Sequence, residues 1–171
     1  MIPNGVTKIG AYAFSSCESL INISIPNTVV EIGEGAFSNC TSLTTITLPN
    51  NITEIVNDMF NWCIKLENIT IPEQVASIGA NAFNGCSSLT SVTIPNDVAE
   101  IGASAFALCS SLKTVYCKPL VPPTLQVSAA HFNQCTLFDQ CTSLETIDVP
   151  DAALEEYKVA TYWANYATYM R

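Results

Sequence analysis

Residues 89–109 read LTSVTIPNDVAEIGASAFALC, and residues 2–117 repeat this stretch with small changes. A fixed period of roughly 20–50 residues is typical of a solenoid, in which each repeat forms one coil that stacks on the next. The period here is 23 residues, and it is plainest in Pro3, Pro26, Pro49, Pro72 and Pro95. Seven other positions keep the same step, and their first members are Val6, Ile9, Phe14, Cys17, Leu20, Ile23 and Ile25.

One copy, residues 43–69, shows what each coil should contain. The segment LTTITL at 43–48 is rich in β-branched residues and alternates polar and apolar side chains near its end, which predicts a short strand. Pro49 ends the strand because proline lacks the N–H that a ladder needs. An extended return segment and then a short helical or 3₁₀ turn follow the strand. Their inward-facing residues are Ile52, Ile55, Phe60, Cys63 and Leu66.

The pattern L-x-x-I-x-I/L-P, followed by V-x-x-I-G-x-x-A-F-x-x-C, resembles the leucine-rich repeats of the BspA-like family, which occurs in many bacterial surface proteins. Five tandem matches lie within residues 2–117. The resemblance implies a leucine-rich-repeat solenoid, a right-handed α/β-type coil. We therefore expect one parallel sheet of about six short strands on the concave face, short helical or 3₁₀ turns on the other side, and a capping helix at the C-terminal end.

Three regions follow from where the repeat holds and where it slips. Residues 1–118 carry five tandem repeats, the first truncated at its N-terminus, which indicates an excised fragment. Residues 119–150 form a divergent last repeat: Cys109 and Cys141 are 32 residues apart, one period of 23 plus a nine-residue insertion. Residues 151–171 form a helical and aromatic cap.

The cap prediction rests on the composition of the tail. Asp151 is a candidate helix N-cap, and residues 152–161 favour a helix. The tail resembles the V-P-x-x-x-x-x-x-Y-K-x-A-x-x-W-x-x-Y segment that often ends BspA-like proteins. A cap that covers the open core is the structural interpretation, and an aromatic ligand patch is the alternative. The aromatic residues concerned are Tyr157, Tyr162, Trp163, Tyr166 and Tyr169.

Charge and hydropathy exclude some partners. The formal net charge is −9, and the six basic residues are scattered, whereas nucleic acids and anionic membranes attract clustered Lys and Arg. No apolar run is long enough for a transmembrane helix, so we expect no membrane insertion by this chain. The N-terminal sequence also lacks the pattern of a signal peptide.

The cysteines invite a metal or disulfide interpretation. Five of them, Cys17 to Cys109, recur once per repeat beside the phenylalanine, and we expect buried, reduced thiols because parallel side chains in single file do not converge on a metal. We therefore expect no metal and no cofactor. Cys117, Cys135 and Cys141 lie outside that pattern, and a disulfide among them stays open.

No arrangement of residues indicates catalysis. His131 is the single histidine, so no Ser–His–Asp or Cys–His set can be built around it in the usual way, and we expect it to be solvated. Phosphate-binding glycine loops and zinc-protease motifs are missing from the sequence. We expect a protein that is not an enzyme.

The outward side chains of the strands are the candidate binding residues. Threonine and serine there suit an exposed pleated surface, so β-propensity and solubility explain them equally well. The functional hypothesis is a hydroxyl-rich concave face that binds a host or matrix protein, so that the module acts in adhesion or protein–protein interaction at the cell surface or after secretion. A spacer without a ligand and a weak glycan-binding module are the alternatives. The candidates are Thr45, Thr47, Asn68, Thr70, Ser91, Thr93, Thr114 and Tyr116.

Overall fold

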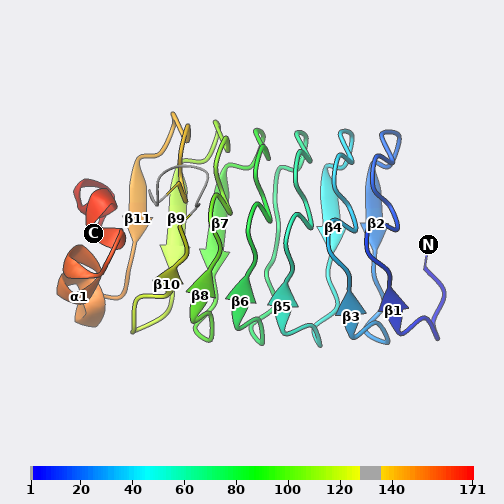
Figure 1. The fold of residues 1–171 in the computed structure, drawn as a ribbon, viewed down its shortest axis with the longest axis horizontal. Coiled ribbons are helices and arrows are strands. Elements are labelled where there is room, and N and C mark those ends of the chain that lie inside the picture. Colours follow the sequence, from blue (N-terminus) through cyan, green and yellow to red (C-terminus); the bar gives the residue numbers. More distant parts are fainter. Residues whose placement is uncertain (1, 128–135) are drawn as a thin grey trace.

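The repeats form coils that stack side by side along the long axis of the molecule (Figure 1). The computed structural model describes residues 2–127 and 136–171. Every named strand pairs in parallel with the equivalent strand of a neighbouring coil. The predicted fold class, a parallel solenoid with a C-terminal helix, is confirmed.

The predicted strands form a ladder that we call the long-strand ladder. Its pairs are in register, with Ile23 opposite Ile46 and Val92 opposite Val115. In the third coil, Asn68 makes only an isolated bridge to Thr45, so the ladder is interrupted there. The strands are β2 (Asn22–Ser24), β4 (Thr45–Thr47), β7 (Ser91–Ile94), β9 (Thr114–Cys117) and β11 (Thr146–Asp148).

A second parallel ladder, which the sequence pattern did not predict and which we call the short-strand ladder, runs through the extended return segments, with a break between the second and third coils. Each strand places a polar residue outward and an apolar residue in the core. Thr124–Leu125, within the predicted divergent last repeat, joins this ladder. Its strands are β1 (Lys8–Ile9), β3 (Glu31–Ile32), β5 (Glu54–Ile55), β6 (Ser77–Ile78), β8 (Glu100–Ile101) and β10 (Thr124–Leu125).

The third side of each coil consists of consecutive turns. The i→i+3 hydrogen bonds expected of 3₁₀ turns are present, for example from Cys40 N to the Phe37 carbonyl. Alternate amides instead donate to the next coil, as Phe37 N does to the Met59 carbonyl. Left-handed residues such as Asn39 and Asp58 break the helical path at fixed places in each coil. The result is a chain of turns linked between coils.

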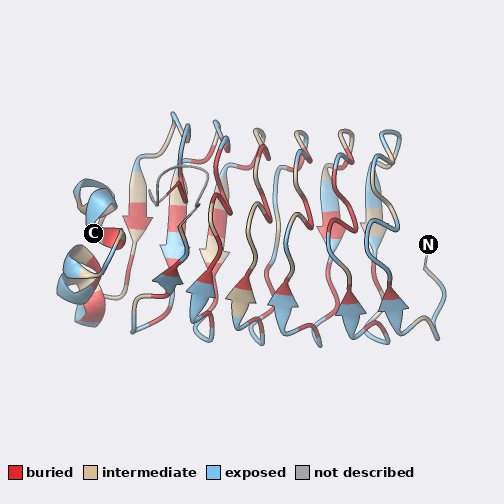
Figure 2. Ribbon diagram, in the orientation of Figure 1, coloured by how far each residue is buried: buried red, intermediate tan, exposed pale blue. Residues whose placement is uncertain are grey.

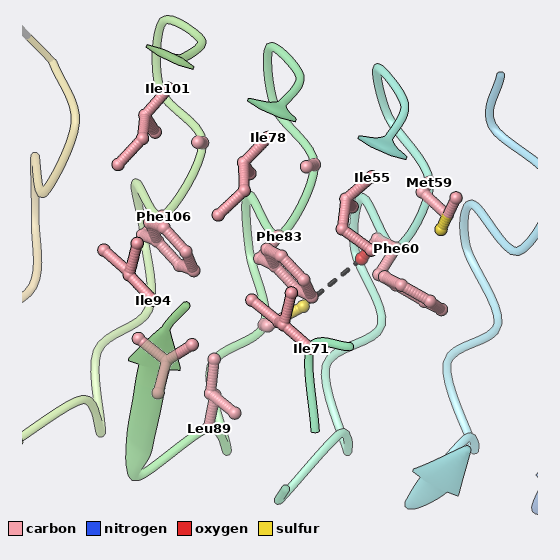
Figure 3. Packing of buried hydrophobic residues seen from close by; sticks show 14 of the residues in the cluster. Ile55, Met59, Phe60, Ile71, Ile78, Phe83, Leu89, Ile94, Ile101 and Phe106 are labelled. Carbon is pink, nitrogen blue, oxygen red and sulfur yellow. Dashed lines mark hydrogen bonds between the residues drawn. The ribbon is translucent and has the colours of Figure 1, made fainter. Parts of the chain in front are cut away.

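Stacked phenylalanines run through the core, one from each coil (Figure 3). The ring centroids of Phe60 and Phe83 are 5.4 Å apart, and those of Phe83 and Phe106 are 5.2 Å apart. Buried residues face the interior of the coils, and exposed residues face outward (Figure 2). This core holds the outward side chains of both ladders in fixed rows.

Close packing between coils explains the glycine that follows the inner isoleucine in three of the coils, at Gly33, Gly79 and Gly102, whereas the third coil has Val56 there. A Cβ atom on Gly79 would lie 2.5 Å from the backbone nitrogen of Asn57 in the preceding coil. Neither Gly33 nor Gly79 has a positive φ. These glycines are therefore explained by the close approach of two backbones and not by a left-handed conformation.

The C-terminal cap consists of a 3₁₀ turn η2 (Asp151–Ala153), the helix α1 (Leu154–Val159) and a 3₁₀ helix η3 (Trp163–Tyr169). The ring of Tyr166 packs edge-on against Phe138, which is the last phenylalanine of the stack. The predicted cap helix is confirmed, but Asp151 lies inside the first turn and not at its N-cap.

Two buried aromatic residues of the cap bind the segment that precedes the insertion. Tyr157 donates its hydroxyl hydrogen to the Pro119 carbonyl at 3.0 Å, and Trp163 donates its Nε1 hydrogen to the Pro123 carbonyl at 2.7 Å. Both side chains are fully buried. These contacts fix the C-terminal end of the stack.

Candidate functional site

The predicted binding residues share one surface, which we call the long-strand face: the outward side of the long-strand ladder. Each of them is exposed or half-buried, and the alternate residues such as Ile46 and Val115 are buried. Because side chains alternate along a strand, burial of the apolar set forces the polar set outward. The structure therefore brings the candidate residues together on one side of the coils.

The register aligns these residues in two rows across the coils. Thr45 lies opposite Asn22 and bridges to Asn68, and Thr47 lies opposite Ser24. On the far side of the third coil, Ser91 lies opposite Thr114, which lies opposite Thr146. The interruption in the third coil divides the face into two parts.

The part nearer the C-terminal end differs in chemistry. Thr93 lies opposite Tyr116, and Tyr116 lies opposite Asp148. A shallow hollow of about 600 Å³ is formed there by these three residues together with Asn96, Cys117, Lys118, Val149 and Pro150. The sequence pattern did not indicate Asp148 as a candidate, because an irregular insertion separates its strand from the regular repeats.

The short-strand ladder presents a second surface, which the sequence did not indicate. A hollow of about 420 Å³ follows several coils there, and Glu31, Glu54 and Glu100 are among its lining residues. Lys8 Nζ lies 2.6 Å from Glu31 Oε1, and Gln126 donates to Glu100. The signal that could have found it was the acidic residue just before the inner isoleucine in several repeats.

The cysteines link one coil to the next through weak hydrogen bonds. Cys63 Sγ donates to the Phe37 carbonyl at 3.2 Å, and one bond of this type is drawn as a dashed line in Figure 3. Burial raises the pKa of Cys40 to about 11 and that of Cys63 further. Free, buried thiols were predicted from Cys17 to Cys109, and the structure shows all five free, with Cys17 only half-buried.

Cys141 belongs to the same series, although an insertion separates it from the regular repeat. Its Sγ donates to the Phe106 carbonyl at 3.1 Å. The neighbouring Cys141 thiol and burial raise the pKa of Cys109, whereas the neighbouring Cys109 thiol lowers the pKa of Cys141. Cys117 and Cys141 are free thiols, and Cys135 and His131 lie outside the described residues.

Metal and membrane sites were sought in the described parts of the chain. Within residues 2–127 and 136–171, no group of three or more His, Cys, Asp or Glu side chains is placed to hold a metal ion. No helix in that same portion is long and apolar enough to cross a membrane.

Comparison with solved structures identifies similar proteins. A leucine-rich repeat protein from Bacteroides ovatus is 38% identical, with a TM-score of 0.74, over 85% of this chain and 35% of that one. A leucine rich cell surface protein from Faecalibacterium prausnitzii is 37% identical, with a TM-score of 0.65, over 81% of this chain and 34% of that one. The chain thus spans about a third of each of these relatives.

A leucine-rich repeat protein of T. pallidum is more nearly equal in length. It is 30% identical, with a TM-score of 0.75, and the match covers 94% of this chain and 80% of that one. No curated protein matches the sequence. The family model for the BspA type leucine rich repeat region matches residues 1–113 in 6 copies. The chain therefore belongs to the BspA-type leucine-rich repeat family.

Proposed function

We propose that this chain is a non-enzymatic adhesion module, at the cell surface or secreted, that binds a host or matrix protein through the long-strand face. The observation that carries the proposal is the row arrangement: the eight candidate side chains are uncharged and exposed or half-buried, and six of them lie in register on paired strands. Hydroxyl and amide groups in fixed rows can donate and accept hydrogen bonds without losing much side-chain entropy. The similarity to a leucine rich cell surface protein supports the location.

The size of this face indicates weak binding by one copy. Strands of three or four residues are about 10–13 Å long, and six rungs about 4.8 Å apart present about 300 Å². A standard interface buries about 800 Å² on each partner. We therefore expect several modules, or a longer repeat array, to act together by avidity.

A spacer that holds another domain away from the cell is the second candidate function. The small area of the face favours it, because a spacer needs no binding surface. The two functions differ in one measurable respect: a spacer has no partner whose binding depends on the long-strand face.

The test is a double variant, Thr47→Glu with Thr70→Glu, displayed on a multivalent scaffold. Binding to a panel of immobilised extracellular-matrix proteins is measured by surface plasmon resonance. We expect the variant to lose at least tenfold in affinity, because two carboxylates must be desolvated against the partner. Its melting temperature should be unchanged, since both side chains are exposed.

The matched control is Thr7→Glu with Thr53→Glu, which adds the same charge at exposed threonines away from the long-strand ladder. This control should bind as the wild type does. Equal binding by all three proteins would remove the long-strand face from the interface, and binding to no matrix protein by the wild type would favour the spacer.

A further inference from the structure

One row of small hydroxyl side chains on the long-strand face ends where an aromatic residue takes its next position. The row runs Ser24, Thr47, Thr70 and Thr93 along successive coils, and the next member is Tyr116. The ring of Tyr116 is 43% exposed, and its hydroxyl has no hydrogen-bond partner among the described residues. A large aromatic surface is thus left in solvent where the other coils carry a small polar group.

The neighbours of Tyr116 are fixed by the sheet. Its strand β9 lies between β7 and β11, so Thr93 flanks the tyrosine on one side and Asp148 flanks it on the other. Adjacent rungs are about 4.8 Å apart, which is within reach of one small ligand. Asn96 and Lys118 complete the polar lining of the hollow.

The hollow suits a neutral ligand. Lys118 already pairs with Glu73 at 2.7 Å, and Asp148 lies 4.0 Å from Arg171 Nε. One cation and one anion therefore line the hollow, each with a partner of opposite charge. A strongly charged ligand gains little from this balance, whereas a ligand rich in hydroxyl groups can use both donors and acceptors.

The sheet at this point does not suit an extended peptide. A peptide that adds to a sheet needs a strand with free backbone groups. Strand β9 is paired along both sides, and so its backbone is occupied. The interactions that the hollow offers come from side chains alone.

We propose that the hollow around Tyr116 binds one pyranose ring of a neutral glycan. The apolar C–H face of the sugar stacks on the exposed ring of Tyr116, which supplies rigid contact area with a polar edge. The two oxygens of the Asp148 carboxylate accept hydrogen bonds from neighbouring sugar hydroxyls, and Thr93 and Asn96 bond to the rest. The volume of the hollow, about 600 Å³, is within the range of small-ligand sites, about 300–1,000 Å³.

This site goes beyond the proposed protein interface and does not depend on it, although Thr93 and Tyr116 belong to both surfaces. Thr47 and Thr70, which test the protein interface, lie outside the hollow, and Asp148 lies outside the eight interface candidates. A failure of one proposal therefore leaves a separate readout for the other.

The experiment is saturation-transfer NMR on the whole chain with the methyl pyranosides of glucose, galactose, mannose and N-acetylglucosamine. The sugars that respond are then titrated. We expect at least one pyranoside to receive saturation, most strongly at the ring protons of one face. Tyr116→Ala should weaken its binding about tenfold. Tyr116→Trp should retain binding, and Asp148→Asn should weaken it less than the tyrosine truncation.

Tyr12→Ala is the matched control, because Tyr12 is also exposed but lies in the first coil, shortly after β1. It should bind as the wild type does, and so should the Thr47→Glu and Thr70→Glu double variant. Circular dichroism melting confirms that every variant is folded. The proposal is wrong if no methyl pyranoside receives saturation or if Tyr116→Ala binds as well as the wild type.

Discussion

The inner coils and the first coil carry the same residues but bury them to different extents. Phe37, Phe60 and Phe83 are fully buried, whereas Phe14 at the equivalent position is only half-buried. The first coil has a described neighbour on one side, and a hollow of about 660 Å³ opens beside Phe14. Burial in this protein therefore depends on neighbouring coils, because one repeat cannot cover its own apolar residues.

The largest expected effect is on the phenylalanine stack. Phe83→Ala removes a fully buried ring that packs against rings in both neighbouring coils, and it should cost about 3–5 kcal/mol of unfolding free energy. Phe14→Ala should cost less than half as much, because that ring stacks on one neighbour and is partly solvated already. Urea unfolding of both variants measures the difference, and equal losses would contradict the dependence on neighbouring coils.

The next effect concerns the C-terminal end of the stack, where the cap covers the last coil. Trp163→Phe keeps most of the buried ring but leaves the Pro123 carbonyl without its donor, which should cost about 1–3 kcal/mol. Thermal unfolding measures this loss. Tyr169→Phe, at an exposed position of the same 3₁₀ helix, is the control and should leave the melting temperature unchanged.

A smaller effect should appear at alkaline pH. Burial raises the pKa of Cys40 from its ordinary 9.0 to about 11 and raises that of Cys63 as well. The neutral thiol is therefore favoured in the folded protein, and its contribution is fully present below pH 9 and is lost as the pH rises toward 11. The unfolding free energy should fall across that interval. A variant with Cys40→Ala and Cys63→Ala should show a weaker fall, and an identical pH profile would argue against this linkage.

Half-buried and fully buried thiols should differ in their reactivity toward alkylating reagents. Cys141 is half-buried and has a lowered pKa, so iodoacetamide should modify it well before the fully buried Cys63 and Cys86. Peptide mapping by mass spectrometry gives the order. Modification of Cys63 as fast as Cys141 in the folded protein would contradict the burial described for the inner coils.

The smallest effect is expected at the exposed ion pair of the first coil. Lys8 and Glu31 are both more than half exposed, so Lys8→Ala should change the unfolding free energy by less than about 1 kcal/mol. High salt should remove most of that difference. A larger loss would mean that the short-strand ladder owes more to charge than to its buried isoleucines.

The core was predictable from the sequence because its residues recur at one fixed interval. Ile55, Phe60 and Leu66 keep their places in every coil, and the structure buries all three. The short-strand ladder escaped prediction because each of its strands has only two residues, too few for an alternating pattern. The left-handed turn positions include Trp62 and residues of several other types, so no single residue type marked them.

The binding surface could be predicted only as a set of outward residues. Thr47 and Thr70 are free of packing constraints, so their identity reflects β-propensity as well as any ligand. The hollow at Tyr116 depends on Asp148, which an insertion separates from the regular repeat. Such a pairing becomes visible only when the coils are stacked.

Amide hydrogen exchange tests the dependence on neighbouring coils most directly. The amides of Phe14, Phe37, Phe60 and Phe83 each donate to a carbonyl of the next coil, at 2.8, 3.0, 2.8 and 2.8 Å respectively, so their hydrogen bonds are equivalent. We predict that the amide of Phe14 exchanges much faster than the other three, because the first coil opens without exposing the inner core. Four equal exchange rates would contradict the account, because burial by neighbouring coils would then not determine local stability.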